Sequence, residues 1–538
     1  MSKRPTFLII VADDLGFSDL GCYGSEINTP NLDKLAQGGV RMTNFHTAAA
    51  CSPTRSMLFS GTDNHIAGLG EMVEYMVSFK EYFQDKPGYE GYLNWRVAAL
   101  PEILQDSGYH TIFSGKWHLG LTKEFSPSSR GFTKDFTFLP GAGNHFGYEP
   151  QLQDDVYFPA LTSKGHWMED GAFFDHEDLP EDFYSTATFT DKMLDKFKLR
   201  TEEERQKPFF ATLAFTAPHW PLQAPKHVVD KYRGKYDQGP DHLAASRLRR
   251  LIDLGLVSKT AQIPDPVGVQ GYEWSTMTAD ARARSARAME VYAAMVEIVD
   301  DNVGRVLKYL EETGELDNTF CVVHIMGGTK TMAYIFDKYY NNSLENIGRP
   351  DSFVWYGPRW ACASTAPSRG MKSWVLEGGI RCPCIVSYPQ WPTSPGAITD
   401  SFTSVMDILP TILELAGVPH PGKTFRGREV VSPRGKSWAN HLSSSSDVRV
   451  SVYDGQVDIH GWEFLNHKAI RKGNWKAVWI SAPRGKDEWE LYDIEKDPSE
   501  LSDLATERPD ILEEMIFHWE QYYSETGMIP TPMLGHRP

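Results

Sequence analysis

The chain has 538 residues, too many for one ordinary hydrophobic core, and this length favours a large domain with a smaller companion. Its 54 Lys and Arg residues against 71 Asp and Glu give a formal charge of -17. A field of that sign repels phosphate groups, so we expect neither a nucleic acid nor a membrane as a partner. A small anionic ligand would need positive charge concentrated at its binding site.

The beginning of the sequence does not have the pattern of a secretory signal. Its apolar run, residues 7–12, is too short for a signal peptide and stops at two aspartates. No later run reaches the length of a membrane span. Six cysteines in a chain this long do not form a dense disulfide framework, and we expect Cys382 and Cys384 to be buried as hydrophobic residues. Together these features predict a cytoplasmic protein.

Four nearly continuous apolar runs, each followed by a loop, predict strands of an open, mostly parallel sheet covered by helices. They are Phe7 to Ala12, Thr111 to Ser114, Phe209 to Phe215 and Phe320 to Ile325. The longest predicted helix covers residues 279–312, where apolar residues recur at steps of three and four. Its polar neighbours lack a sustained pairing pattern, so a helix lying on the sheet is favoured over a coiled coil.

The character of the sequence changes after about residue 400. A helix is predicted over 407–416, and loops rich in Pro and Gly follow it. Segments 468–471 and 475–479 alternate in polarity around a Lys-Gly-Asn turn, as in an antiparallel hairpin, and a last helix is predicted near 509–523. We therefore predict an α/β fold: a large, mostly parallel mixed sheet flanked by helices in residues 1–445, and a smaller antiparallel sheet plus helix in residues 446–538.

Polar residues follow three of the four predicted strands, at the edge where open α/β sheets bind ligands. Asp13 and Asp14 follow the first strand, where a cation could hold both carboxylates, although a solvated turn is the commoner explanation. Lys116 and His118 follow the second, and in an extended segment both would project to one side and meet one ligand. His219 follows the third between two prolines, which suits a positioned acid or base as well as a structural histidine.

The strongest local signal is Cys51-Ser52-Pro53-Thr54-Arg55. A proline in the first turn of a helix costs no hydrogen bond, so Pro53 places Cys51 at a helix N-terminus and Arg55 one turn later on the same face. The helix N-terminus and the guanidinium both favour an anionic group there. A buried apolar cysteine is the alternative, but it explains neither Pro53 nor Arg55.

These motifs occur in the order found in one family. The Asp-Asp pair, Cys-x-Pro-x-Arg, Gly-Lys-Trp-His-Leu-Gly at 115–120, Ala-Pro-His-Trp-Pro at 217–221 and segment 372–383 together resemble the type I, formylglycine-dependent sulfatases of the alkaline phosphatase superfamily. The sequence looks closest to the bacterial-type arylsulfatases, and the resemblance covers nearly the whole chain. It implies a sulfuric ester hydrolase that converts a small-molecule aryl or alkyl sulfate to an alcohol or phenol plus inorganic sulfate.

The resemblance also implies catalytic roles. Cys51 would be oxidised to formylglycine by a formylglycine-generating machinery and hydrated to a diol, one hydroxyl of which attacks sulfur while the other later helps to eliminate sulfate. Arg55 would steady that diol. His118 would assist the elimination, and His219 would protonate the leaving alcohol or phenol.

Substrate and metal ligands follow from the same resemblance. Lys116 and Lys372 would bind oxygens of the sulfate group. Asp13, Asp14 and residue 51 would hold one Ca²⁺, which polarises the diol and the sulfate.

The sequence departs from the family pattern after the fourth strand, where sulfatases carry Ser-Asp-Asn-Gly with two further metal ligands. Here that strand runs into Met-Gly-Gly-Thr-Lys at 326–330, without a carboxylate, and similarity resumes at Asn342. The pair Asp317-Asn318 precedes the strand, so we place it at the opposite end of the sheet from Asp13. Three interpretations stay open: a weakened enzyme, a non-catalytic sulfatase-like binding protein, and a sequence that lacks a segment of the functional protein. A phosphate or phosphonate ester hydrolase of the same superfamily is the alternative enzyme.

Overall fold

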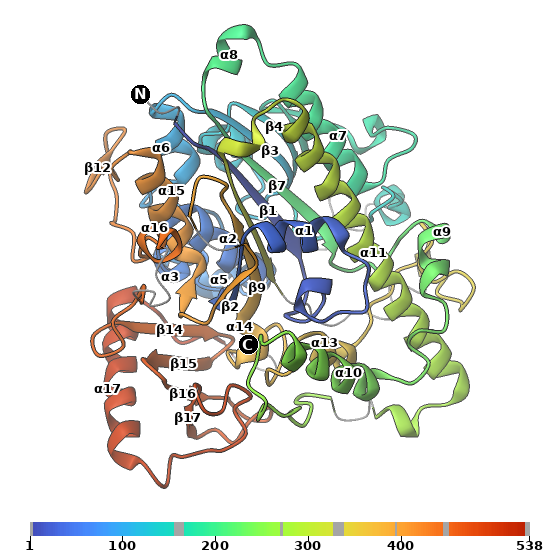
Figure 1. The fold of residues 1–538 in the computed structure, drawn as a ribbon, viewed down its shortest axis with the longest axis vertical. Helices are drawn as coiled ribbons and strands as arrows, with labels where there is room; N and C mark the ends of the chain where they lie inside the picture. Colours follow the sequence, from blue (N-terminus) through green and yellow to red (C-terminus); the bar gives the residue numbers. More distant parts are fainter. Residues whose placement is uncertain are drawn as a thin grey trace.

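The computed structural model describes residues 4–154, 166–269, 273–326, 338–392, 395–444 and 451–532. Its centre is an 11-stranded sheet in the order β10-β2-β9-β8-β1-β7-β3-β4-β5-β6, with β11 paired to β2 (Figure 1). The strands are β1 Thr6–Asp13, β2 Val40–His46, β3 His110–Lys116, β4 Lys134–Phe138, β5 Trp167–Glu169, β6 Ala172–Phe174, β7 Phe209–Pro218, β8 Thr319–Met326, β9 Arg381–Ser387, β10 Ala397–Thr399 and β11 Thr403–Ser404. A separate two-stranded ribbon pairs β12 Thr424–Phe425 with β13 Arg428–Glu429.

The four strands predicted from apolar runs are β1, β3, β7 and β8. They are neighbours in the order β8-β1-β7-β3 and run parallel to one another. Within this sheet, the antiparallel pairs among the described strands lie toward the flanks, where β9 pairs with β2 and β8, and β5 pairs with β4 and β6. The predicted mostly parallel mixed sheet is therefore confirmed. Cys382 and Cys384 on β9 are buried, as expected.

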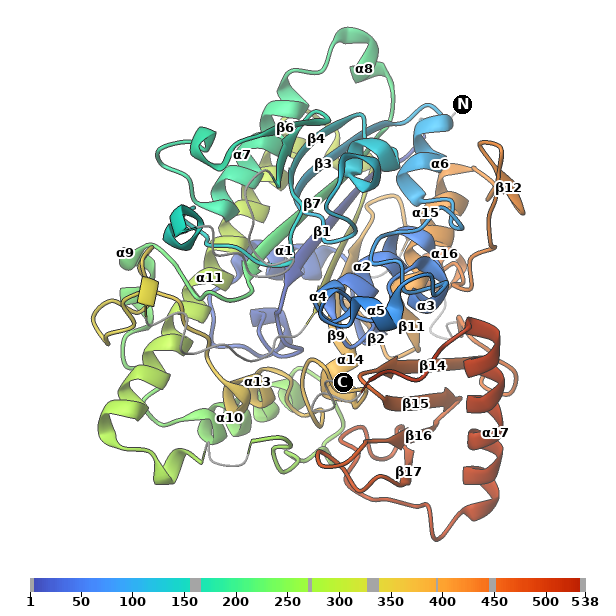
Figure 2. The ribbon, with the colours of Figure 1, turned by 180° about the vertical axis from the view of Figure 1, so that it is seen from behind.

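Helices cover both faces of this sheet (Figures 1 and 2). α1 Pro30–Gly38, α7 Ser185–Lys198 and α11 Ala279–Glu312 pack together on one face, and α2 Cys51–Ser60, α6 Leu100–Asp106 and α15 Ile408–Ala416 lie on the other. The other described helices before the C-terminal sheet are α3 Asn64–Ala67, α4 Val73–Ser78, α5 Lys80–Phe83, α8 Glu202–Gln206, α9 Lys226–Val229, α10 Pro240–Asp253, α13 Pro358–Ser364, α14 Glu377–Ile380 and α16 Ala439–Ser443. No helix among these described segments is long and apolar enough to cross a membrane.

The long helix α11 has the bounds that its periodicity predicts, and it lies on the sheet against β7. Every residue from 288 to 300 is buried, so the middle of the helix is covered on all sides rather than along one narrow stripe. Within this buried stretch, the Tyr292 hydroxyl lies within hydrogen-bond distance of two acceptors, Asp19 Oδ2 at 2.6 Å and the Asp14 carbonyl oxygen at 3.0 Å. The helix thus supports the turn that follows β1.

The C-terminal part forms a four-stranded antiparallel sheet in the order β14-β15-β16-β17. Its strands are β14 Ile459–Phe464, β15 His467–Lys472, β16 Trp475–Trp479 and β17 Trp489–Asp493, and α17 Pro509–Thr526 packs beside them (Figure 1). The predicted hairpin turn lies between Lys472 and Trp475, which are cross-strand partners in the antiparallel β15–β16 pair. Apolar side chains from the strands and the helix, such as Ile470, Leu491 and Trp519, fill the space between them.

Strand register brings the polar strand ends to one edge. Asp13 at the end of β1 pairs with Pro218 on β7 and with Met326 on β8. The side chain of Asn318 instead donates to the Arg4 carbonyl oxygen at 2.8 Å, at the start of β1. The predicted placement of Asp317-Asn318 at the opposite end of the sheet is therefore confirmed.

A buried histidine joins the two sheet-bearing parts of the chain. His65 Nδ1 lies 2.9 Å from Asp63 Oδ1, and its Nε2 lies 3.3 Å from Glu463 Oε2 on β14. Burial disfavours the charged ring, but the hydrogen bonds and charges of the two carboxylates outweigh burial and raise the pKa of His65 to about 10.

This raised pKa predicts how stability depends on pH. The histidine stabilises the fold fully below its unfolded pKa of about 6.5 and loses that contribution as pH rises through about 10. Urea unfolding between pH 6 and 10 should show this decline. His65→Gln should remove the decline and lower the free energy of unfolding by about 3 to 5 kcal/mol, because two carboxylates stay buried without their cation. The exposed His242→Gln is the control, and an unchanged slope in His65→Gln would contradict the assignment.

Candidate active site at the carboxyl edge of the sheet

Two buried aspartates form the base of the site. Asp13 pairs with Lys116 Nζ at the end of β3, and its Oδ2 accepts from Arg55 Nη2 at 3.2 Å. Burial acts to raise the pKa of Asp13, but these two cations hold it well below its usual range. The pKa of Asp14 behaves differently: burial raises it to about 6 although Lys372 opposes the shift. The two neighbouring carboxylates therefore differ in acidity.

Cys51 is the first residue of α2, as predicted, and its side chain is fully buried. Its Sγ lies 3.2 Å from Asp13 Oδ1 and 2.9 Å from Lys372 Nζ. Arg55, one turn later, reaches the same aspartate, so the predicted shared face is confirmed. Burial and the charge of Asp13 raise the pKa of the Cys51 thiol to about 12. The thiol is therefore protonated at neutral pH and does not supply a thiolate nucleophile.

Positive charge is concentrated around this sulfur atom. Lys372 donates to Asp14 Oδ1 at 2.7 Å, and Arg55 Nη1 donates to the Lys116 carbonyl oxygen at 2.5 Å. Three buried cations, Lys116, Lys372 and Arg55, thus face two carboxylates. The excess of positive charge suits an anionic ligand, and the low dielectric of a buried site strengthens that attraction.

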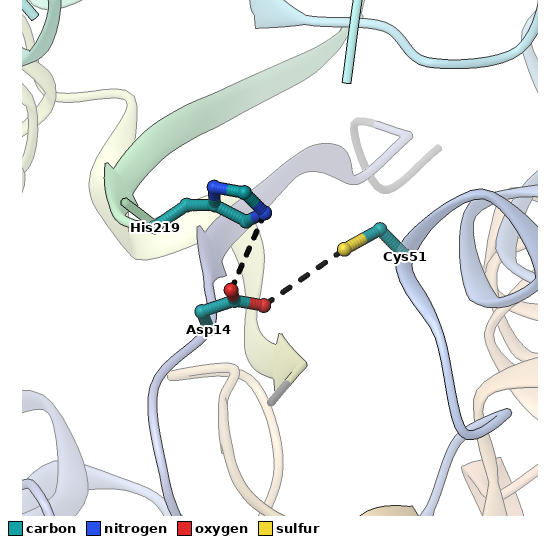
Figure 3. Close-up of side chains that lie close together, drawn as sticks. All are labelled: Asp14, Cys51 and His219. Atoms are coloured by element: carbon teal, nitrogen blue, oxygen red, sulfur yellow. Dashed lines mark hydrogen bonds and ion pairs between the residues drawn. The ribbon is translucent and has the colours of Figure 1, made fainter. Parts of the chain in front are cut away.

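His219 follows β7 and points toward Asp14 (Figure 3). Its Nδ1 donates to the Trp220 carbonyl oxygen at 2.7 Å, because a carbonyl oxygen can only accept. Burial, with Lys372 and Lys116 adding to it, lowers the pKa of His219 well below its usual value, so Nε2 carries a lone pair in the neutral ring. That lone pair faces Asp14 Oδ2 at 3.3 Å, and this oxygen accepts no hydrogen bond within the described chain. Two facing acceptors require a proton or a cation between them.

His118 corrects one expectation from the sequence. β3 ends at Lys116, and His118 adopts a left-handed backbone with φ of 58°, so the segment is not extended through it. Lys116 reaches Asp13, whereas His118 Nε2 lies 2.9 Å from Glu74 Oε1 on α4. Burial acts to raise the pKa of Glu74, but His118 holds it below its usual value, so the carboxylate is ionised and Nε2 donates to it. Burial also lowers the pKa of His118, so the ring is neutral and Nδ1 keeps a lone pair. That Nδ1 is buried and has no hydrogen-bond partner among the described residues.

Glu74 is a site residue that the sequence did not predict. It lies on a six-residue helix without a motif, and only its spatial neighbour reveals it. Of the eight predicted site residues, Asp13, Asp14, Cys51, Arg55, Lys116, His219 and Lys372 form one network of direct contacts. His118 instead contacts Glu74, which also lines the cavity that opens onto Asp14 and Lys372. The segment 327–330, which lacks the expected carboxylate, lies outside the described residues.

A cavity of about 570 Å³ opens onto Asp14 and Lys372. Aromatic side chains from distant segments form much of its wall: Trp220, Trp355, Tyr356, Trp374 and Phe464. These rings come from the loop after β7, the loop before α13, the loop that carries Lys372, and strand β14. Such a wall suits an apolar group attached to the anion. No motif in the sequence marks these rings as one wall.

Comparison with known proteins agrees with these features. The sulfatase family model matches residues 5–418, and the C-terminal model of N-sulphoglucosamine sulphohydrolase matches residues 371–518. An uncharacterised sulfatase of Schizosaccharomyces pombe is 52% identical over 99% of this chain and 95% of its own length. The arylsulfatase of Klebsiella aerogenes is 35% identical over 81% of this chain and 91% of its own length.

Solved structures share the fold. The crystal structure of Ps i-CgsB covers 98% of this chain and 95% of its own, with a TM-score of 0.69 and 22% identity. That of BT4656, in complex with its substrate D-glucosamine-2-N,6-O-disulfate, covers 97% and 98%, with a TM-score of 0.62 and 21% identity. The family model and the sequence relatives show that this chain belongs to the sulfatases and is a sulfuric ester hydrolase.

Proposed function

We propose that the chain hydrolyses the sulfate ester of a small, apolar alcohol or phenol, with formylglycine at position 51 and a divalent cation at the two aspartates. The observation that carries this proposal is the network around Cys51 Sγ. Three cations and two carboxylates meet there, all buried, at the inner end of an aromatic cavity.

The state of Cys51 supports its modification. A protonated, fully buried thiol is a poor nucleophile, yet it lies at the point where the cations and the cavity meet. Formylglycine would supply at this position a hydrated aldehyde whose hydroxyl is the nucleophile toward sulfur. The family membership and the Cys-x-Pro-x-Arg motif favour that change, and a formylglycine-generating machinery is then a necessary partner.

The residues fit a hard cation in part. Asp14 Oδ2 has no hydrogen-bond partner among the described residues and faces a lone pair of His219, so a cation could bind between them. Asp14, Cys51 and His219 offer ligand atoms within 4.8 Å of one another. Asp13, Asp14 and an oxygen of residue 51 would hold Ca²⁺, with water, sulfate oxygens or other residues supplying the rest of its six to eight ligands. The ion would contribute Lewis-acid polarisation of the sulfate group.

The chain's own side chains then bind and orient the sulfate. Lys116 and Lys372 direct their ammonium groups into the network and would pair with sulfate oxygens. Arg55 is fixed by Asp13 and the Lys116 carbonyl oxygen, so it would hold the oxygens of residue 51 in place. The aspartates hold the two ammonium groups in place before a substrate binds.

Two histidines would move the protons. His118 donates a hydrogen bond from Nε2 to Glu74, which leaves a lone pair on Nδ1. His118 would therefore act as a base during elimination. His219 has its Nδ1 hydrogen committed to Trp220, so only Nε2 can carry a proton to the leaving oxygen. The negative charge of a bound sulfate ester would favour that protonated form.

A cytoplasmic location is part of this proposal. All six cysteines are free, which is usual in a reducing compartment.

The test combines a peptide mass spectrum across residue 51 with metal analysis and turnover of matched aryl sulfate and aryl phosphate. We expect the mass of formylglycine, bound calcium, and much faster cleavage of the sulfate. Faster cleavage of the phosphate would favour a phosphate ester hydrolase instead. A free thiol without turnover, in protein that still binds a sulfate ester, would show a non-catalytic binding protein.

A further inference from the structure

A second cavity, of about 750 Å³, lies where the large sheet meets the C-terminal sheet. It is lined by residues of β2, the start of β9, and strands β14 and β15, which meet near α14 in Figure 1. It shares no lining residue with the cavity at the active site. Whatever binds here therefore binds apart from the catalytic network.

Two buried arginines contribute to this wall. Arg381 and Arg471 are each 7% exposed, yet neither forms an ion pair with a carboxylate within the described chain. Arg381 Nε donates to the Thr43 carbonyl oxygen at 2.6 Å. Arg471 Nε donates to the Gly473 carbonyl oxygen at 3.0 Å, and its Nη1 reaches Asn44 Oδ1 at 3.3 Å. These bonds orient both guanidiniums and use less than half of their donors.

The Glu377 carboxylate, which lines the same cavity, is already paired with other cationic or hydrogen-bonding groups. Glu377 Oε2 lies 2.9 Å from His46 Nε2, and its Oε1 lies 2.8 Å from Lys476 Nζ. Lys476 also pairs with Glu500 at 2.8 Å. The local group thus contains three cations, the two arginines and Lys476, against two carboxylates, one positive charge in excess even with both carboxylates ionised.

Other groups at the cavity do not cancel that excess. Asp400, Asp454 and Glu495 are exposed, where water and salt weaken their field, and Asp458 pairs with Lys436. His460 is buried, and burial lowers its pKa well below the usual value, so its ring is neutral. Its Nε2 has no hydrogen-bond partner among the described residues. The buried wall therefore offers unpaired donors and positive charge to a ligand.

We propose that Arg381 and Arg471 form a second anion site, which takes one tetrahedral oxyanion, inorganic sulfate or phosphate. A guanidinium presents parallel N–H donors that match two oxygens of such an ion. In a low dielectric, two guanidiniums attract a doubly charged oxyanion more strongly than they attract a singly charged carboxylate ligand. The cavity also has room for the water shell of that ion. The site does not involve residue 51 and stands independently of the proposed catalytic chemistry.

The experiment is calorimetric titration of the full chain with sulfate and, separately, with phosphate, at constant ionic strength set by chloride. Lys372→Ala weakens anion binding at the active site, so the remaining isotherm reports the arginine site. In that background Arg471→Gln should lower the affinity for whichever anion binds more tightly by about tenfold or more, because a charge-assisted pair is lost. Arg426→Gln, which changes an exposed arginine elsewhere, is the matched control.

Arg471→Lys keeps the charge but loses the two-pronged contact, and we expect an intermediate affinity. This second substitution keeps the test valid if Arg471→Gln fails to fold. Unfolding curves recorded without added anion would reveal such a folding defect. Whichever of sulfate and phosphate binds more tightly identifies the ligand. The proposal would be overturned if neither Arg471 substitution changed the affinity for either anion. It would also be overturned if Lys372→Ala alone abolished all anion binding.

Discussion

Cys51→Ala is expected to lower kcat/KM for an aryl sulfate by about 10⁴-fold or more, the scale of loss seen when a nucleophile is removed from an otherwise intact site. The substitution leaves Lys116, Lys372 and the two aspartates paired, so binding of the sulfate group should persist. A large fall in kcat with a small change in KM is therefore the expected signature. Steady-state kinetics on an activated aryl sulfate measure it.

A second buried cysteine provides the control. Cys321 on β8 is as buried as Cys51 but lies within the sheet core, so Cys321→Ala should keep most of the activity of each folded molecule. Cys51→Ser tests whether the residue acts as a plain nucleophile or through its modification. Activity of Cys51→Ala within tenfold of the parent chain would mean that residue 51 is not the nucleophile.

His219→Ala should show a loss that depends on the leaving group. If Nε2 protonates the leaving oxygen, poor leaving groups such as alkyl alcohols need that proton, and their turnover should fall by about 10² to 10⁴-fold. A nitrophenol leaves as its anion and should lose far less. A series of aryl and alkyl sulfates therefore separates proton donation from a purely structural role.

The plot of log kcat against the pKa of the leaving group should be steeper in His219→Ala than in the parent chain. His242→Ala, at an exposed position, is the matched control and should keep the parent slope. An equal loss for every leaving group would instead assign His219 to metal or sulfate binding through its contact with Asp14.

The sequence by itself determined the centre of the fold and most of the site. The four apolar runs became β1, β3, β7 and β8, because a strand buried on both faces must be apolar along its whole length. The bounds of α11 followed from its periodicity and a Thr N-cap, which are local signals. Four residues of the network, Asp13, Asp14, Lys116 and His219, lie together because parallel strands end at the same edge of a sheet.

Only the tertiary structure decided the features built from distant residues. The antiparallel flank of β2 and β9 depends on pairing between segments more than 300 residues apart, which no local pattern encodes. Glu74 meets His118, and the aromatic wall assembles from four segments, solely because of how the chain packs. The pKa values of Asp13 and Asp14 are driven apart because burial and neighbouring charges act through space rather than along the sequence. For the same reason no sequence pattern shows that Arg381 and Arg471 are buried without an ion pair in the described part of the chain.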